Sequence, residues 1–507
     1  MVFAILMVLI LLFSMYHIRK TKTASGATAI QVVEYVKRKL VVARHVGSAR
    51  TSTELQSLED TAMQWIEKHV GQKPLFEPPP MKYLLGRYEY TGVRYTFIYE
   101  TLHKLLLRFG FTSLGGKLLH DLVLIRIIEP VSKLQSLALL EEYFGISHRR
   151  QSFYEWLPKF VTFKDAAEKL VVKRAKEEFG FDFSLVFYDV TTLYYESFES
   201  DDLRKPGFSK DNKSQQPQIV LGLVVNIHGF PVSYEIFEGN KFEGHTLIPV
   251  IKAFKEKHEV PTLTVVADAA MISRDNVKAL EENDLNYIVG ARLGNISPKL
   301  ISEISDKLGR KDKATMRIKT DLGTLVCDFK EKRYAKDKRE MEKQMKRAEK
   351  IIEDPTKAKR AKFVKSNDSS YELNNDLLEK AKLLLGIKGY YTNLGEDVDN
   401  KTIIDHYHSL WHVEQAFRVA KSDLSTRPIF HFKKEAIQTH ILICFMALAV
   451  SKYMEIKVGL SLKRIITSLK HVTDAILVDK VTSKENVMRM NMNEETRDIL
   501  KELSLPY

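Results

Sequence analysis

The order of apolar runs between residues 183 and 290 constrains the fold more than any other feature of the chain. Three strand-like runs come first, and each of two later runs follows a helical pattern. We expect the first three strands to be antiparallel neighbours and the later ones to join through helices. The predicted strands are residues 183–188, 218–227, 230–237, 262–267 and 286–290, and the predicted helices are 245–258 and 273–283. This order predicts an α/β core.

An insertion of about 90 residues (296–386) interrupts this core. It begins with β-like segments and continues as a charged helix at 337–353. Residues 330–365 hold 15 Lys or Arg against 7 Asp or Glu. That imbalance favours a phosphate-contact surface over a merely solvated helix face. The core then resumes with a strand at 389–394, a long helix at 402–424 and an apolar helix at 438–456. The unbroken apolar stretch of this last helix is too short to span a bilayer.

The region before the core divides at the three consecutive prolines of residues 78–80. The pattern of residues 15–80 predicts a basic β-meander followed by a helix. Residues 81–180 predict a mostly helical N-terminal region, which Gly180 ends. Its helices at 132–144 and 151–160 have the spacing of a helix-turn-helix, and equally of a plain helical hairpin, so this is a candidate DNA-binding region.

The remaining domain boundaries follow from these patterns. The catalytic core is predicted at residues 181–295 and 387–457, and a C-terminal helical tail at 458–507. Residues 1–14 are apolar but too short for a transmembrane helix, and they lack the basic start of a signal peptide. The pattern favours a mis-assigned upstream extension before Met15 over a membrane anchor.

The composition narrows the partners and the compartment. The formal net charge of +13 favours a polyanionic partner, of which nucleic acid is the commonest. The two cysteines, Cys327 and Cys444, exclude a disulfide scaffold and a Cys-rich zinc site, and they fit a reducing cytoplasm. We expect a cytoplasmic, nucleoid-associated protein with no membrane partner.

Two aspartates follow apolar strands of the predicted core. Asp189 and Asp268 each stand at the predicted C-terminal end of such a strand. Side chains at strand ends of an open α/β core project into the cleft where ligands bind. A single such aspartate is often a helix cap or a turn residue, but two at matching places in neighbouring strands favour a shared site.

A third acidic residue lies on the predicted helix at 402–424. The spacing places Tyr407, Trp411, Glu414, Arg418 and Lys421 on one helical stripe. A core stripe would be apolar, and a solvent-facing stripe would rarely carry two aromatic residues. An acid with cations one and two turns later suits a metal site beside a phosphate backbone.

Three converging carboxylates predict a particular metal chemistry. Asp189, Asp268 and Glu414 offer oxygen ligands suited to Mg²⁺, for which Mn²⁺ can substitute. Two such ions, about 4 Å apart, can activate a water or a 3′-hydroxyl and stabilise the leaving oxygen at phosphorus. The sequence contains no Walker loop, no HExxH and no GxSxG motif. We interpret His406 and His408 as structural or DNA-proximal residues rather than metal ligands.

At this point the sequence resembles the DDE transposases of bacterial insertion sequences. The family pattern is Tyr, two residues, Arg, three residues, Glu, six residues, Lys; Tyr407, Glu414 and Lys421 fit it, with Leu410 in place of Arg. The segments that carry the resemblance are 187–193, 265–270 and 407–421, with further similarity at 207–211, 239–240 and 425–431. Within these enzymes the chain is similar to the insertion-sequence-four superfamily and its sixteen-thirty-four branch.

The resemblance implies a fold and residue roles. The fold is a ribonuclease-H-like core with a β-rich, partly helical basic insertion between the second Asp and the Glu. Asp189, Asp268 and Glu414 would ligate two metal ions, and Tyr407 and Lys421 would position DNA phosphates. Arg418 is added from the helical stripe as a further DNA contact. The expected partners are double-stranded DNA, at transposon ends and target, and a second copy of the chain in a synaptic complex.

Two other functions remain open from the sequence. A ribonuclease-H-like nuclease would cut DNA without joining ends, and the basic insertion and helical N-terminal region argue for the transposase instead. A non-catalytic DNA-binding regulator would not need the three carboxylates, all of which are present.

Overall fold

The computed structural model describes residues 16–70, 87–196, 198–208, 213, 215–354, 361–367 and 370–506. They form two compact units. The first joins the described residues up to Arg94 with Thr473–Asn491, and the second joins Tyr95–Val472 with the described residues from Met492 onward. The expectation about residues 1–14 falls outside the described residues. Within those residues, no helix is long and apolar enough to cross a membrane.

The first unit contains two small antiparallel sheets. One has the order β1-β2-β3, and its three strands carry the alternating pattern that predicts a meander. Helix α2 (Ser52–Val70) packs on this sheet. The other sheet has the order β16-β15-β4. The strands are β1 (Tyr16–Lys22), β2 (Thr28–Val36), β3 (Lys39–Ala49), β4 (Tyr88–Arg94), β15 (Asp474–Asp479) and β16 (Glu485–Arg489).

The helical prediction for residues 458–507 is therefore wrong in part. Helices α17 (Leu462–Lys470) and α18 (Glu494–Glu502) do occur there, but a β-hairpin separates them. Strand β15 pairs with β4, nearly 400 residues earlier in the chain, and Arg87 binds Asp479 with an Nη2–Oδ2 distance of 2.9 Å. Such long-range pairing overrides local propensity.

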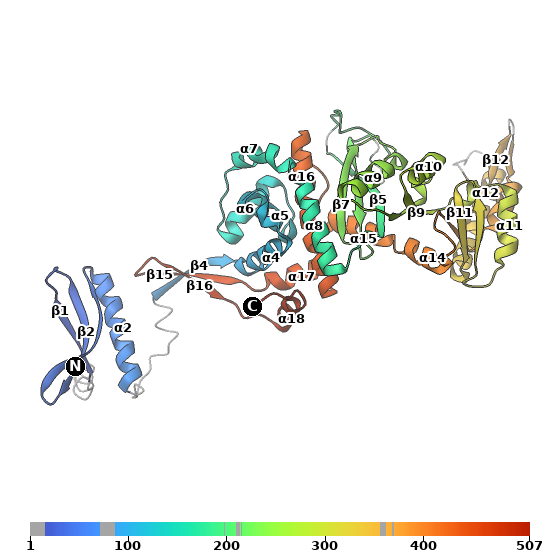
Figure 1. Ribbon diagram of the computed structural model, residues 1–507. Helices are drawn as coiled ribbons and strands as arrows, with labels where there is room; N and C mark the ends of the chain where they lie inside the picture. The colour runs from blue at the N-terminus through green and yellow to red at the C-terminus, as the bar shows by residue number, and fades with distance from the viewer. Residues whose placement is uncertain are drawn as a thin grey trace. The chain divides into compact units, whose positions relative to one another are not determined.

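The second unit is built on an eight-stranded sheet with the order β10-β11-β14-β9-β8-β5-β6-β7 (Figure 1). Strands β5, β6 and β7 are antiparallel neighbours, and β8 and β9 run parallel to β5, as the sequence predicts. The five core strands are β5 (Leu185–Tyr194), β6 (Gln218–Val225), β7 (Pro231–Glu238), β8 (Leu263–Ala267) and β9 (Leu285–Gly290). Helix α9 (Leu247–Lys257) connects β7 to β8, and α10 (Arg274–Glu282) connects β8 to β9.

Asp189 does not end its strand, contrary to the sequence-based prediction. Strand β5 continues to Tyr194, because it keeps pairing with β6 after its parallel pairing with β8 stops at Tyr188. Asp268 does follow the last residue of β8, Ala267, as predicted. Its carboxylate caps the short helical turn after the strand by accepting a hydrogen bond from the Ala269 amide at 2.7 Å.

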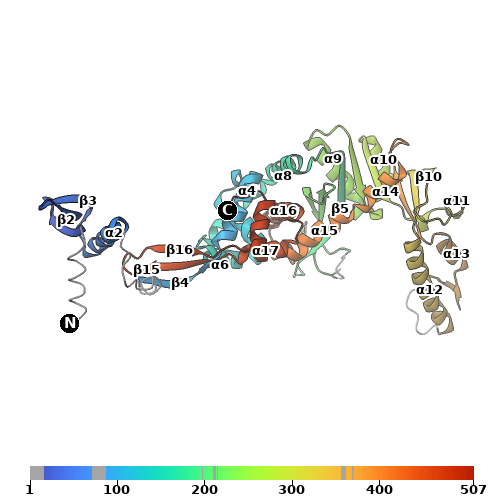
Figure 2. The same ribbon diagram turned by 90° about the horizontal axis from the view of Figure 1, so that it is seen from below.

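Strands β10 and β11 of the inserted residues extend the core sheet, while β12 and β13 form a separate two-stranded sheet. Strand β11 pairs with β14, which pairs with β9, so insertion and core share one hydrogen-bonded surface. Helix α12 projects from this region in Figure 2. The elements are α11 (Pro298–Leu308), β10 (Thr315–Thr320), β11 (Gly323–Phe329), α12 (Glu331–Glu353), β12 (Val364–Asn367), β13 (Ser370–Leu373), α13 (Asn375–Leu383) and β14 (Ile387–Thr392).

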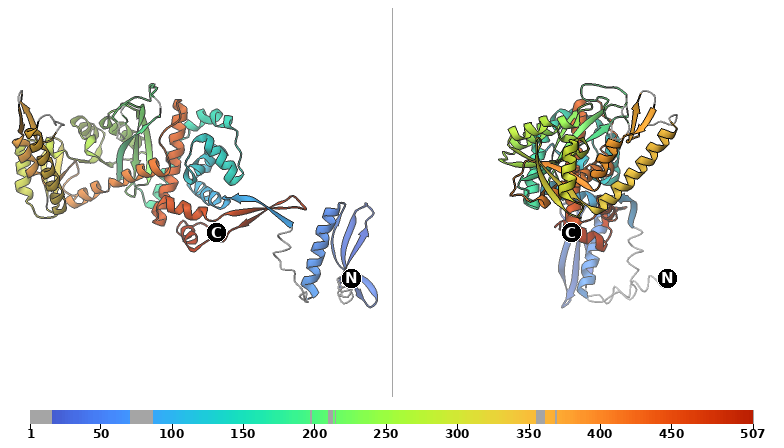
Figure 3. Two further views of the ribbon diagram at one scale, coloured as in Figure 1. Left: turned by 180° about the vertical axis from the view of Figure 1, so that it is seen from behind. Right: turned by 90° about the vertical axis from the view of Figure 1, so that its right-hand side faces the viewer.

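A helical layer precedes and follows the core in the second unit. The predicted helix pair is present as α6 and α7, joined through Gly145 at φ 68°, and Gly180 ends α8 at φ 60°. The long apolar helix α16 packs against α5 and α7 (Figure 3, left). These helices are α4 (Thr96–Phe109), α5 (Lys117–Ile128), α6 (Lys133–Phe144), α7 (Arg150–Val161), α8 (Lys164–Phe179) and α16 (Lys434–Val458).

The single long helix predicted at 402–424 is three segments. Helix α14 (Asn400–His408) ends one turn before α15 (Trp411–Arg418), and a π-helical turn, η6 (Val419–Asp423), follows. At the first break, the amides of Leu410, His412 and Val413 each bond to the carbonyl three residues earlier. These tighter turns change the residue period from 3.6 to about 3, so the predicted stripe does not stay on one face.

Candidate active site

The strand register brings Asp189 and Asp268 together. Tyr188 of β5 pairs with Ala267 of β8, so the two aspartates are the next residues along adjacent parallel strands. Such strands lie about 4.8 Å apart. Gly290 continues this row on β9, since Val289 pairs with Ala267. Two carboxylates therefore stand side by side near the middle of the sheet, in a row that we call the acidic row.

Side-chain alternation gives the face on which the acidic row lies. Successive side chains of a strand point to opposite faces. Tyr188 points toward the start of α9, where its hydroxyl donates to Thr246 Oγ1 at 2.8 Å. Asp189, the next residue, therefore points to the other face, on which α15 packs against β5 and β6.

Tyr407 connects helix α14 to the acidic row. Its hydroxyl donates a hydrogen bond to Asp268 Oδ1 at 3.3 Å, and the side chain is only 7% exposed. Burial raises the pKa of Tyr407 well above its ordinary value, and the charges of Asp268 and Glu414 raise it further. A Cβ on Gly290 would lie 2.4 Å from the Tyr407 hydroxyl. The absence of a side chain at Gly290 is thus what admits Tyr407 to Asp268.

Glu414 lies on the exposed side of α15, in the first turn of that helix. It is close enough to Tyr407 to act on it electrostatically. Among the described residues, however, no three His, Cys, Asp or Glu side chains converge closely enough to hold one metal ion. The structure therefore pairs two of the predicted acids and brings the third near Tyr407, without gathering all three around one point.

The donor set nevertheless fits hard divalent ions. Magnesium keeps several waters and binds proteins through one or two carboxylates together with substrate phosphates, instead of through an all-protein cage. The Asp189 and Asp268 pair, with Glu414 on the helix over the same face, supplies such oxygen ligands. Soft ligands are absent from the acidic row, so the site does not suit a thiolate-bound metal.

A partly buried lysine that the sequence analysis missed lies beside Tyr407. Lys388 of β14 places its ammonium 4.4 Å from the centroid of the Tyr407 ring and 5.6 Å from that of Tyr390. Burial, and secondarily Arg333 at the start of α12, lower the pKa of Lys388, while Asp328 and Asp268 oppose this effect. The sequence could have indicated Lys388, because it is a charged residue within the otherwise mostly apolar strand Ile387–Thr392.

The insertion supplies a further acid near the site. Asp328 of β11 is 3% exposed and accepts a hydrogen bond from the Tyr390 hydroxyl at 3.1 Å. Lys330 lies 3.6 Å from this carboxylate and donates to His408 Nε2 at 2.8 Å. Burial and the Lys330 charge lower the pKa of His408. His408 is thus an acceptor in a protein network, in keeping with the structural interpretation of this residue.

Of the three predicted DNA contacts, Tyr407 binds Asp268 of the acidic row, whereas Arg418 and Lys421 lie on α15 and η6. Trp411 and Arg418 are exposed on α15, Trp411 to 51%, and Lys421 lies half-buried in η6. Burial, and then the charge of Glu455, raise the pKa of Asp423. The charge of Arg418 opposes this effect and lowers that pKa. These residues do not form one face with the buried Tyr407, because of the break before α15.

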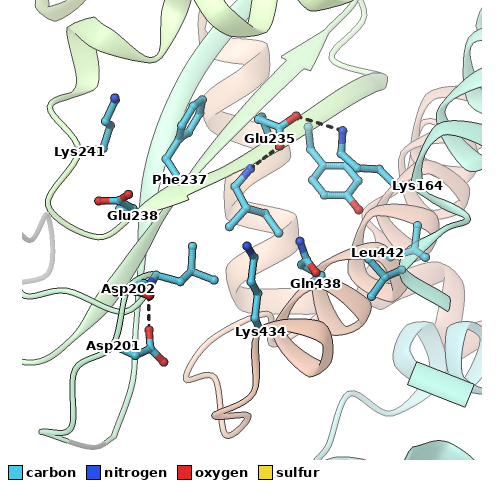
Figure 4. Close-up of a pocket in the computed structure, with 14 residues that line it drawn as sticks. Lys164, Asp201, Asp202, Glu235, Phe237, Glu238, Lys241, Lys434, Gln438 and Leu442 are labelled. Carbon is cyan, nitrogen blue, oxygen red and sulfur yellow. Dashed lines mark hydrogen bonds and ion pairs between the residues drawn. The ribbon is translucent and has the colours of Figure 1, made fainter. Parts of the chain in front are cut away.

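A cavity of about 550 Å³ lies away from the acidic row, along the edge strand β7. Figure 4 shows Glu235 of β7 reaching Lys164 of α8, an ion pair of 3.1 Å, with Lys434 and Gln438 of α16 across the opening. Strand β6 separates β7 from β5. The cavity is therefore not part of the site that contains Asp189 and Asp268.

A mixed sheet with three antiparallel strands, two further parallel strands and acids on its two central strands is the arrangement of a ribonuclease-H-like nucleic-acid enzyme. The family model described as "Transposase DDE domain" matches residues 180–450, more than half of the chain. The chain belongs to this family. It is an enzyme of DNA transposition, and its family acts on DNA with divalent metal ions.

Three solved structures have some similarity to the chain. A piggyBac transposase synaptic complex with hairpin DNA has 11% identity and a TM-score of 0.38, covering 69% of this chain and 68% of that one. A Mos1 transposase paired-end complex with the left transposon end has 15% identity and a TM-score of 0.16, covering 45% and 66%. A Mos1 mariner paired-end complex with Mn has 15% identity and a TM-score of 0.15, with the same coverage. A search of curated proteins finds no match.

Proposed function

We propose that the chain cuts DNA at transposon ends and joins those ends to target DNA, with Asp189, Asp268 and Glu414 as the metal-binding residues. The observation that carries the proposal is the register that sets Asp189 beside Asp268 on adjacent strands of the family's core. When bound, two Mg²⁺ ions, or Mn²⁺ in their place, would activate the attacking oxygen and stabilise the leaving one.

The residues around these carboxylates would orient them and attract the DNA phosphate. Tyr407 holds one Asp268 oxygen, so the other stays free to face a metal ion. Its burial favours action through Asp268 over direct contact with a DNA phosphate. Lys388 offers a positive charge beside the same carboxylate, where a scissile phosphate would also be attracted. Lys421 and Arg418 would contact the DNA flanking that phosphate.

The insertion would provide a wider DNA surface. Residues spaced by four, three, four, three and four along α12 lie on one helical stripe. Its six exposed cations are Lys332, Lys336, Arg339, Lys343, Lys346 and Lys350. We call this set the basic stripe. A row of cations suits the phosphate backbone of a duplex. One of the six, Lys343, also lies 3.9 Å from Glu340 on the same helix.

The finer assignments of the enzyme complete the proposal. We place the chain in the insertion-sequence-four superfamily and its sixteen-thirty-four branch on the pattern of Tyr407, Glu414 and Lys421. Joining two ends requires a synaptic complex, which a homodimer would form. The basic net charge of +13 fits a bacterial cytoplasmic protein associated with the nucleoid.

The test is cleavage and strand transfer on the element's own ends, with and without Mg²⁺. We expect Asp189→Asn to abolish cleavage while end binding stays within about threefold of wild type, because the amide keeps the shape but loses the charge that metal binding needs. Asp275→Asn, in the exposed first turn of α10, is the matched control and should cut normally. Cleavage by purified Asp189→Asn would refute the site.

The same assay separates the alternatives. Cleavage without joining would identify a nuclease. End binding without cleavage by the wild-type protein would identify a regulator.

A further inference from the structure

Four basic side chains, which become cationic when protonated, meet between helices α5, α6 and α16. They are Arg126 of α5, Lys133 of α6, His431 of the segment before α16, and His440 of α16, and we call them the cationic cluster. The His431 and His440 rings are 5.6 Å apart. No Asp or Glu of the described chain is among the groups that act electrostatically on Lys133, His431 or His440. The protein thus collects basic groups here without an acidic side chain acting on these three.

Two members of the cationic cluster have buried polar atoms without partners. Arg126 is 4% exposed, and its Nε has no hydrogen-bond partner, while its Nη1 donates to the Leu424 carbonyl at 3.5 Å. His440 is 5% exposed, and its Nε2 donates to the Thr426 carbonyl at 3.0 Å, which leaves Nδ1 without a partner. A buried polar group left unsatisfied costs roughly 1–3 kcal/mol. A bound anion would accept a hydrogen bond from Arg126 Nε, and from His440 Nδ1 once that ring is protonated.

The pKa values of three members of the cationic cluster lie below their ordinary values. Burial, and then the Arg126 charge, lower the pKa of Lys133 to about 7. Burial, with Lys133 and Arg126, lowers the pKa of His431 to about 4 and that of His440 well below its ordinary value. An anion among these groups would favour their protonated forms and so take up protons on binding.

The cationic cluster is open to the surface on one side. Lys133 and His431 are half-buried and both lie near Phe153 of α7. The Lys133 Nζ is 5.9 Å from the centroid of the Phe153 ring, and the centroid of the His431 ring is 6.0 Å from it. Arg150 and Tyr154 line a small cavity with Lys133. This cavity holds only about 10 Å³, so an anion would enter between α6 and the segment that carries His431 as the long Lys133 and Arg150 side chains move aside.

This segment is attached to the predicted catalytic elements at both ends. Leu424 and Thr426, whose carbonyls accept bonds from Arg126 and His440, directly follow the turn that carries Lys421. Further on, the Ile429 amide donates to the Tyr194 carbonyl at 3.3 Å, at the end of the strand that carries Asp189. The cationic cluster is thus fixed relative to the acidic row.

We propose that the cationic cluster binds one phosphate group of the DNA on which the acidic row acts. This inference rests on the proposed function for the identity of the DNA, whereas the anion site itself rests on the unpartnered buried groups. Arg126 would donate through Nε, and protonated His440 through Nδ1, while Lys133 and His431 would close the entrance. The phosphate would hold a DNA strand at a fixed distance from the scissile bond.

Sulfate is the probe for the anion site, since it mimics phosphate and its charge is constant between pH 6 and 8. We expect sulfate, compared with chloride at equal ionic strength, to raise the unfolding temperature of the full-length protein, more strongly at pH 6 than at pH 8. Arg126, Cys444, His431 and His440 interact electrostatically with Lys133, and Arg150 lines the adjoining cavity. Lys133 has a pKa of about 7, whereas the pKa of His431 is about 4 and that of His440 lies well below its ordinary value, so Lys133 is the member of the cationic cluster that titrates in this range.

The test variant is Lys133→Met, which keeps the aliphatic stem and removes the charge. Without sulfate it should unfold at a higher temperature than wild type, because repulsion within the cationic cluster is relieved. It should lose most of the sulfate response, whereas Lys159→Met, on the exposed side of α7, should keep it. Equal sulfate responses of wild type and Lys133→Met would overturn the anion site.

A competition measurement tests whether the anion is a DNA phosphate. Sulfate in place of chloride should weaken binding of a transposon-end duplex to wild type several-fold more than to Lys133→Met. Sulfate stabilisation without this competition would overturn the DNA assignment. Asp189→Asn should keep the sulfate response, so a failure of cleavage and a failure of the anion site can be distinguished.

Discussion

The Tyr407 hydroxyl donates a hydrogen bond to the Asp268 carboxylate at 3.3 Å and so joins helix α14 to the end of strand β8. The bond exists because β9 carries Gly290 where any other residue would occupy the position of the hydroxyl. One of the two paired acids therefore has an orientation set by a residue 139 positions later in the chain.

Tyr407→Phe tests the importance of that orientation. The change removes one hydrogen bond to a charged group, worth about 1.5–3 kcal/mol. We expect cleavage at low Mg²⁺ to fall by roughly ten- to a hundredfold, because each 1.4 kcal/mol corresponds to a factor of ten, with partial recovery at high Mg²⁺. A Mg²⁺ titration of the cleavage rate measures this. A rate that falls equally at all Mg²⁺ concentrations would instead assign Tyr407 to DNA contact.

The fold of the core was predictable from the sequence because each of its strands is marked locally. The run Gln218–Val225 is apolar after its first residue and buried throughout. The two core helices have clear ends, including the Ser273 cap that accepts from the Asn276 amide at 3.1 Å. The family pattern likewise singled out Asp268 and Glu414, whose roles as metal ligands stay a prediction. Local signals sufficed where hydrophobic period and capping agreed.

Other features depend on partners distant in sequence and were not predictable. Strand β5 extends past Asp189 only because β6 continues beside it, and the hairpin of β15 and β16 forms with β4. The break before α15 consists of backbone turns that leave no residue signature. Lys388 and Asp328 join the site because the insertion extends the core sheet.

Gly290→Ala should disturb the site sterically. The added Cβ would meet the Tyr407 hydroxyl at 2.4 Å, so Tyr407 must shift away from Asp268. We expect a loss of about 1–3 kcal/mol in the free energy of unfolding, as for other overpacked positions, and a fall in cleavage at least as large as that of Tyr407→Phe. Denaturant unfolding and the cleavage assay measure the two effects.

Gly294→Ala is the matched control, because a Cβ at Gly294 meets no atom within 4 Å. The double variant Gly290→Ala with Tyr407→Phe removes the clashing hydroxyl. Its stability loss should be smaller than the sum of the two single losses. Additive losses would show that the steric account of Gly290 is incorrect.

The basic stripe of α12 should determine part of the salt dependence of DNA binding. Replacing Lys336, Arg339 and Lys346 by Gln removes up to three phosphate contacts. Each contact contributes about 0.9 to the slope of log affinity against log salt, so the slope should decrease by up to about 3. Fluorescence anisotropy with a duplex over a range of salt concentrations measures the slope.

A control with equal loss of charge excludes a general effect of net charge. Exposed lysines at positions 252, 278 and 299 lie on α9, α10 and α11, outside the basic stripe. Their replacement by Gln should leave the slope nearly unchanged. Equal decreases for both triple variants would remove α12 from the DNA surface.

His258 should make the stability of the second unit depend on pH between about 6.5 and 4. Its ring packs with Phe254 and Phe183 at 4.7 and 5.5 Å, and its Nε2 is buried without a hydrogen-bond partner. Burial, and then the Lys257 charge, lower the pKa of His258 to about 4. In this range the unfolded chain binds a proton that the folded protein does not, so the free energy of unfolding falls as pH falls.

His258→Phe removes the titrating ring and keeps the aromatic contacts. The variant should be more stable than wild type at pH 5 by roughly 1 kcal/mol, an amount that allows for solvent screening at a half-buried site. Denaturant unfolding at pH 5 and pH 8 measures the difference, with His471→Gln as the control at an exposed histidine. An advantage of His258→Phe that is the same at both pH values would mean that the gain comes from packing alone.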